Sequence, residues 1–136
     1  MAVVVELIRS QEDGTLCFGN HTLDSKTKVE DYSAFGSLYK VKTFKELTKL
    51  ERDGMFVYES EPGTSVNNFK ALENGVAFTV SGAEDAMITV GLVEDTEYVV
   101  TVDGKNIGTI KTNLGGKLSF SVALDSEKEV DITIEK

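Results

Sequence analysis

Apolar and polar residues alternate with a period of two through the second half of the chain. The pattern is clearest in 118–124, where Leu118, Phe120 and Val122 are separated by small or polar residues. Successive side chains of a strand point to opposite faces, so this spacing gives a strand one apolar face and one polar face. Three more segments follow the same pattern: 76–80, 88–92 and 130–134. Such half-buried strands are typical of antiparallel sheets.

Turn-forming dipeptides separate these segments at short intervals. Asn74-Gly75 and Asp103-Gly104 are examples, and both provide the positive φ angles that tight hairpin turns need. From Gly75 onward the spacing predicts six strands. The first half is less regular. There the sequence predicts strands over 3–9, 15–19 and 38–44, and a loop or irregular edge over 22–35.

Segment Phe44–Arg52 fits two structures. Phe44, Leu47 and Leu50 fall at i, i+3 and i+6, which allows a short helix. However, Asp53-Gly54 and a strand-like run, 55–58, come next. A hairpin that turns at Asp53-Gly54 explains both sides with one turn, and we favour it.

Many short strands with frequent turns predict an all-β fold. We expect an antiparallel β-sandwich of jelly-roll or immunoglobulin-like type, or a partly closed barrel, with about ten short strands. The only proline, Pro62, lies in a turn-forming run, and we place a boundary there. It divides an N-terminal β lobe, 1–62, from a C-terminal β-sandwich lobe, 63–136, which we expect to pack as one compact unit.

The charge balance argues against two classes of partner. The 136 residues carry a formal net charge of −9, and an acidic surface repels nucleic acid and anionic lipid. No apolar run reaches the roughly 18 residues that a membrane span needs. The first residues lack the basic stretch of a signal peptide, so we expect a cytoplasmic protein, with export without a leader left open.

Few residues are suited to catalysis or metal binding. His21 is the only histidine and Cys17 the only cysteine. A turn at Gly19-Asn20 would allow them to meet, but we expect Cys17 to be a small strand residue and His21 a polar turn residue. A zinc site needs three or four ligands, and the acidic pairs lack the alternating spacing of a calcium loop. We therefore predict no catalytic residue, no metal and no cofactor.

An aromatic cluster is the best candidate ligand platform. Tyr32, Phe35 and Tyr39 fall in the least regular segment, and sugar-binding sandwiches stack sugar rings on exposed aromatic side chains. The alternative, which we favour, is that these three residues cap the open end of the core.

The chain is expected to begin and end in strands with an apolar face. A terminal strand either completes its own sheet, which we favour, or pairs with a neighbouring chain and so drives assembly. In the second case the contacts would come from Val3, Val5, Leu7, Val130, Ile132 and Ile134.

A set of segments carries a resemblance that covers nearly the whole chain. The segments are Leu38–Thr43, Lys49–Gly54, Val57–Thr64, Asn68-Phe69, Asp95–Tyr98, Asn106–Gly108 and Asn113–Ser119. Together they resemble a family of small proteins of clostridial type that are often labelled "endosialidase" in genomes. That label implies a glycosidase. Sialidases typically hold the substrate carboxylate with three arginines, whereas this chain has only Arg9 and Arg52, so one chain cannot build the triad.

The leading hypothesis is a non-catalytic structural or interaction protein that works by binding or by self-assembly. If it assembles, we expect its terminal strands to make the contacts. Its partner would be a second copy or another protein. The alternative is a carbohydrate-binding module with a glycan ligand, and a sialidase-like glycosidase is the remote alternative.

Overall fold

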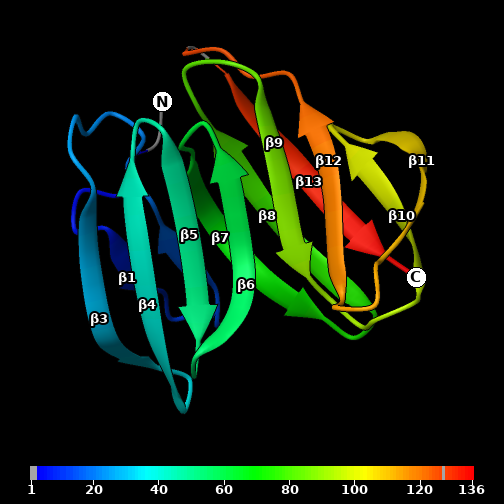
Figure 1. Cartoon of the computed structure of the whole chain (residues 1–136), viewed down its shortest axis with the longest axis horizontal. Coiled ribbons are helices and arrows are strands. Elements are labelled where there is room, and N and C mark those ends of the chain that lie inside the picture. Colours follow the sequence, from blue (N-terminus) through cyan, green and yellow to red (C-terminus); the bar gives the residue numbers. More distant parts are fainter. Residues whose placement is uncertain (1–2, 127) are drawn as a thin grey trace.

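The computed structural model describes residues 3–126 and 128–136, and it is all-β (Figure 1). The first seven strands are β1 (Ile8–Ser10), β2 (Leu16–Phe18), β3 (Thr27–Ala34), β4 (Ser37–Phe44), β5 (Leu47–Arg52), β6 (Met55–Glu61) and β7 (Ser65–Leu72). The other six are β8 (Gly75–Ser81), β9 (Ala86–Gly91), β10 (Glu97–Val102), β11 (Lys105–Lys111), β12 (Lys117–Val122) and β13 (Glu129–Glu135). This described part contains no helix of the length and apolar character that a membrane crossing requires.

The strands form two antiparallel sheets that pack as a β-sandwich. Sheet A has the order β1-β2-β7-β8-β13-β10-β11, and sheet B has the order β12-β9-β6-β5-β4-β3. The predicted fold class is confirmed, with thirteen described strands in place of about ten. The six strands predicted from Gly75 onward are also present, as β8 to β13.

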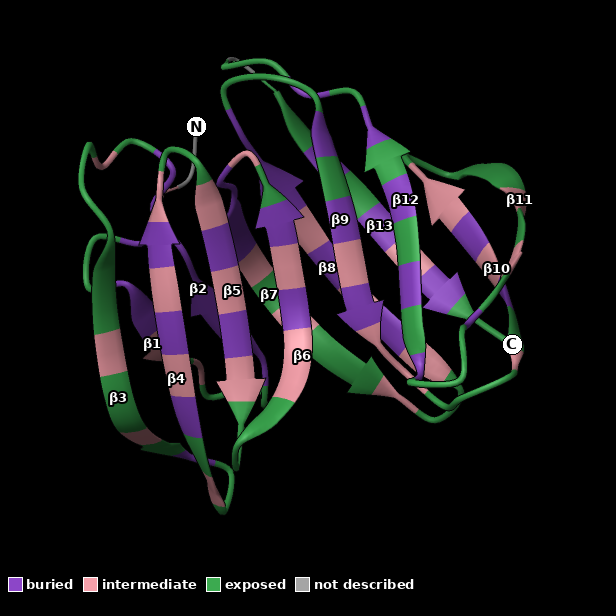
Figure 2. Cartoon of the chain, in the orientation of Figure 1, coloured by how far each residue is buried: buried purple, intermediate pink, exposed green. Residues whose placement is uncertain are grey.

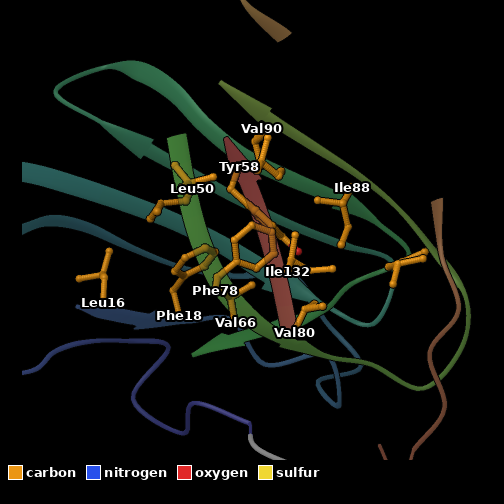
Figure 3. Packing of buried hydrophobic residues seen from close by; sticks show 14 of the residues in the cluster. Leu16, Phe18, Leu50, Tyr58, Val66, Phe78, Val80, Ile88, Val90 and Ile132 are labelled. Carbon is orange, nitrogen blue, oxygen red and sulfur yellow. The ribbon is translucent and has the colours of Figure 1, made fainter. Parts of the chain in front are cut away.

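The core lies between the inner faces of the two sheets, and buried positions alternate with intermediate or exposed ones along most strands (Figure 2). At its centre Tyr58 of sheet B inserts between two rings of sheet A (Figure 3). Its ring centroid lies 5.2 Å from that of Phe18 and 5.7 Å from that of Phe78, with edge-to-face geometry. Burying one such ring stabilises the fold by about 1.5–3 kcal/mol.

The hairpin predicted at Asp53-Gly54 is confirmed. β5 pairs with β6 in an antiparallel ladder that closes at Arg52 and Met55. Asp53 and Gly54 have φ angles of 50° and 79°, as the favoured two-residue hairpin turn requires.

The predicted loop or irregular edge is an edge strand. β3 forms the end of sheet B, and its pairing with β4 shifts register between Val29 and Tyr32.

The segment around Pro62 carries the chain from sheet B to sheet A. Residues on both sides of it are joined in each sheet, because β2 pairs with β7 and β6 pairs with β9. One hydrophobic core contains residues of both 1–62 and 63–136.

The strand expected over 3–9 is wrong for most of its length. β1 begins only at Ile8, because the Leu7 N–H donates to the Val4 carbonyl at 2.9 Å and Leu7 has a φ of 73°. This turn changes which residues point inward. Val4 is fully buried and Val5 is 78% exposed, so Val3, Val5 and Leu7 do not share one strand face.

The C-terminal strand is in the middle of its sheet. β13 pairs with β8 on one side and with β10 on the other. Val130, Ile132 and Ile134 are buried in the core. The chain therefore completes its own sheet with this strand, as we favoured, and the three residues offer no free edge to a second copy.

Candidate functional site

A cleft of about 440 Å³ opens between the sheets at one end of the sandwich. The turns at 53–54 and 73–74 and the loops 92–96 and 112–116 gather at this end, which is the lower end in Figure 1. Apolar side chains from both sheets line the cleft: Met55, Phe56, Val57, Leu72, Leu92 and Val93. Polar side chains also line it: Arg52, Glu73, Asn74 and Lys136. Apolar clefts with a few polar groups are the usual form of binding sites.

A β-bulge shapes the wall formed by sheet B. Leu50 pairs with Tyr58, whereas the next residue, Glu51, pairs with Phe56, so Val57 has no partner in the ladder. An extra residue of this kind bends the strand and redirects its side chains. The half-buried Val57 side chain therefore packs against the edge of the core at the cleft.

Close packing around Gly91 holds Phe56 in place. A Cβ atom at Gly91 would lie 2.6 Å from the Phe56 carbonyl oxygen, so only glycine fits there. The Lys117 ammonium group lies 4.6 Å from the centroid of the Phe56 ring. This cation–π contact covers part of the ring and fixes this wall of the cleft.

Val93 presents an exposed apolar side chain from a fixed backbone. Its N–H donates to the buried Tyr98 hydroxyl at 3.2 Å, and its carbonyl accepts a bond from the Thr112 hydroxyl at 2.6 Å. The side chain is nevertheless 55% exposed. A partner that covers Val93 would gain apolar burial without having to order the backbone first.

Asp53 joins two hairpin tips beside the cleft. Its carboxylate accepts the Leu38 N–H at 2.9 Å, and its own N–H donates to the Leu38 carbonyl at 2.7 Å. Hydrogen bonds from the Leu38 backbone and the Ser37 side chain lower the pKa of the Asp53 carboxyl. The β3–β4 and β5–β6 hairpins are thus tied together at this end of the molecule.

The structure does not assemble the predicted aromatic platform. Tyr39 is buried on the inner face of sheet B. Tyr32, its cross-strand partner, packs against the core, and its hydroxyl accepts the Ser10 N–H at 2.9 Å. Only Phe35, at the β3–β4 turn, is well exposed, at 54%. Tyr32 and Tyr39 therefore pack against the core, whereas Phe35 does not.

The two residues considered for nucleophilic chemistry are buried. Cys17 is buried in β2, and His21 is buried with its Nδ1 2.7 Å from the Ser65 hydroxyl. Burial lowers the pKa of the His21 imidazole. The Ser65 side chain is fully buried, so a substrate cannot reach this hydroxyl in the folded state. Among residues 3–126 and 128–136, no three or more His, Cys, Asp or Glu side chains gather as a metal site would require.

The chain matches no protein-family model, no curated protein and no solved structure. The two arginines lie on strands of different sheets. Arg9, on β1, forms an ion pair with Glu6 at 3.2 Å, and Arg52, on β5, lines the cleft. Sequence reasoning missed the cleft, since its residues come from strand ends and loops that are far apart in the sequence.

Proposed function

We propose that this protein is a non-catalytic β-sandwich that functions by binding another protein at the cleft between its sheets. The observation that carries the proposal is Val93, an exposed apolar side chain on a backbone held by Tyr98 and Thr112. Met55, 72% exposed, also lines the cleft. Apolar contacts at the centre of an interface, surrounded by polar groups, supply most of the binding energy in protein complexes.

The lining of the cleft favours a protein partner over a glycan. Its exposed apolar side chains, Met55 and Val93, are not aromatic, and Lys117 already lies over the ring of Phe56. We expect an apolar side chain of the partner to enter the cleft. Arg52 and Lys136 would then attract acidic residues beside it, and Glu73 would pair with a basic one.

A phage-displayed peptide library tests this function. Peptides are selected on the wild-type protein, and their affinities are compared on Val93→Asp and Leu114→Asp. Leu114 is the matched control, because it is 81% exposed at the same end of the molecule and does not line the cleft. We expect selected peptides to share an apolar residue and to lose at least tenfold in affinity on Val93→Asp only. Equal binding to both variants would exclude the cleft as the binding site.

Self-assembly is the second candidate. β1 forms an edge of sheet A, and the exposed Val5 lies just before it, so this side of the molecule offers apolar contact area. Light scattering over a dilution series measures the mass in solution. A mass that stays well above 14.8 kDa on dilution supports assembly, and a monomer at all concentrations argues against it.

A further inference from the structure

The four edge strands of the sandwich are protected to different degrees. Unpaired backbone groups at an edge are a template for another strand, and short strands, bulges and charges are the usual protection. β1 has three residues, and both β3 and β11 contain register shifts. In β11 the shift lies at Ile107 and Gly108, and lysines stand at both ends of the strand. β12 differs, since its six residues pair with β9 without a shift and Lys117 is its only charge.

The pairing with β9 shows which backbone groups of β12 face outward. The Leu92 N–H donates to the Gly116 carbonyl at 2.7 Å, and antiparallel ladders alternate between bonded and non-bonded pairs. Even-numbered residues of β12 therefore bond to β9. Ser119 and Ser121 direct their N–H and C=O groups away from it, and no other strand in the described part of the chain pairs with this edge.

The turn before β12 caps the first outward-facing residue. The Lys117 N–H donates to Asn113 Oδ1 at 3.0 Å, and the Lys117 carbonyl accepts the Asn113 N–H at 3.0 Å. The open part of the edge therefore starts at Ser119.

β12 is recessed relative to the other sheet. In Figure 1, β10 and β11 extend beyond β12 on the right-hand side. A strand added to β12 would lie over the inner face of β10 and β11, where Val102 and Ile110 are only partly buried. Because β10 and β11 lie beyond this edge, it is better suited to a single extended segment than to the edge of a second folded sandwich.

We propose that β12 binds one extended peptide segment of another protein by antiparallel strand addition. The outward N–H and C=O groups of Ser119 and Ser121 form its hydrogen bonds. Alternate apolar side chains of the segment cover Val102 and Ile110. The segment runs from Ser121 toward Ser119, so an acidic C-terminal end lies beside Lys117, whose ammonium group also lies over the Phe56 ring of the cleft wall. No residue of β12 lines the cleft, and this site does not rest on the proposed function.

A labelled peptide and a pair of proline variants test the site. The probe is a fluorescein-labelled peptide of alternating valine and threonine that ends in two glutamates, followed by fluorescence anisotropy. Ser121→Pro removes one outward N–H, which an edge strand tolerates. Thr109→Pro is the matched control on β11. The Thr112 N–H donates to the Thr96 carbonyl at 2.9 Å, so the N–H of Thr109 also faces outward.

We expect saturable binding by the wild-type protein, a loss of at least tenfold in affinity in Ser121→Pro, and a change of less than twofold in Thr109→Pro. A second measurement with wild-type protein keeps the test independent of how the variants fold. Methylating the peptide nitrogens that point toward β12 should abolish binding, and methylating the alternate nitrogens should leave it unchanged. No saturable binding by the wild type, equal losses in both proline variants, or equal effects of both methylation patterns would overturn the proposal.

Discussion

Thr64 lies at the centre of a buried hydroxyl network, so its hydroxyl should matter strongly for stability. It follows Pro62 in the segment that crosses between the sheets. Its Oγ1 lies 2.7 Å from the Tyr58 hydroxyl and 2.7 Å from the Ser60 hydroxyl, and all three side chains are fully buried. The pKa of the Tyr58 phenol is raised by its burial, so the phenol stays protonated. Thr64→Val keeps the shape of the side chain and removes the shared oxygen.

The expected cost follows from the groups left behind. In Thr64→Val the hydroxyls of Tyr58 and Ser60 lose this partner without gaining access to water. A buried polar group left unsatisfied costs about 1–3 kcal/mol, so the substitution should lower the free energy of unfolding by about 2–4 kcal/mol. Tyr58→Phe leaves Thr64 bonded to Ser60 and should cost only about 0.5–1.5 kcal/mol.

Urea unfolding of the two single variants and the double variant measures these values. In the double variant, residue 58 is phenylalanine, so no phenol hydroxyl is left unsatisfied there. Its loss should therefore be smaller than the sum of the two single losses by about 1 kcal/mol, a coupling typical of residues in one network. Additive losses, or a loss below about 0.5 kcal/mol in Thr64→Val, would refute this reasoning.

Three further predictions concern other parts of the fold. Burial lowers the pKa of the His21 imidazole, so the unfolded chain binds a proton at this residue more readily than the folded chain. The free energy of unfolding should therefore fall as the pH drops below about 6.5, and it should fall less steeply in His21→Gln. Urea unfolding midpoints at high and low pH measure this difference. Gly63→Ala places a Cβ 1.9 Å from the Phe44 carbonyl oxygen and should cost more than about 3 kcal/mol in calorimetry, and retained stability would contradict this packing. Lys111→Ala removes an exposed ion pair with Asp95 and should leave the urea unfolding midpoint nearly unchanged, and a clear drop in the midpoint would contradict this.

Strands were easiest to predict from the sequence where one face of the strand is buried and the other is exposed to solvent. In β12 the burial of side chains alternates from Lys117 to Val122, as the sequence pattern of this segment indicates. The choice between helix and hairpin was settled by the turn residues, because Asp53-Gly54 specifies a tight turn whatever the spacing of the residues before it. Short-range sequence signals were therefore sufficient to predict most strands in the second half of the chain.

The predictions that were wrong or incomplete have causes that the pattern of apolar residues does not encode. The turn at Leu7 changes which of the N-terminal side chains point inward, although Val3, Val4 and Val5 favour a strand. β3 was not identified as a strand, because its register shift breaks the period of two and most of its residues are exposed. The central place of β13 depends on pairing with two strands far apart in the sequence.

The cleft depends on contacts that no local pattern contains. Its exposed apolar residue, Val93, is fixed by hydrogen bonds from Thr112, 19 residues away, and to Tyr98. Its opposite wall depends on a bulge that only the pairing of β5 with β6 reveals. The sequence shows Val93 as one apolar residue in a loop. Only the folded chain shows that its backbone is already ordered.

This ordering also accounts for the different parts that Val93 and Met55 would take in binding. The backbone of Val93 is already ordered, so covering its side chain would cost little further ordering. Met55 is unbranched and flexible, so it can adjust to the shape of a partner, as methionine does at adaptable binding surfaces. Under the proposed function, a cleft with one fixed and one adaptable apolar contact would favour partners that share an apolar anchor but differ in the residues around it. Its exposed part would then accept a class of partner segments rather than one sequence.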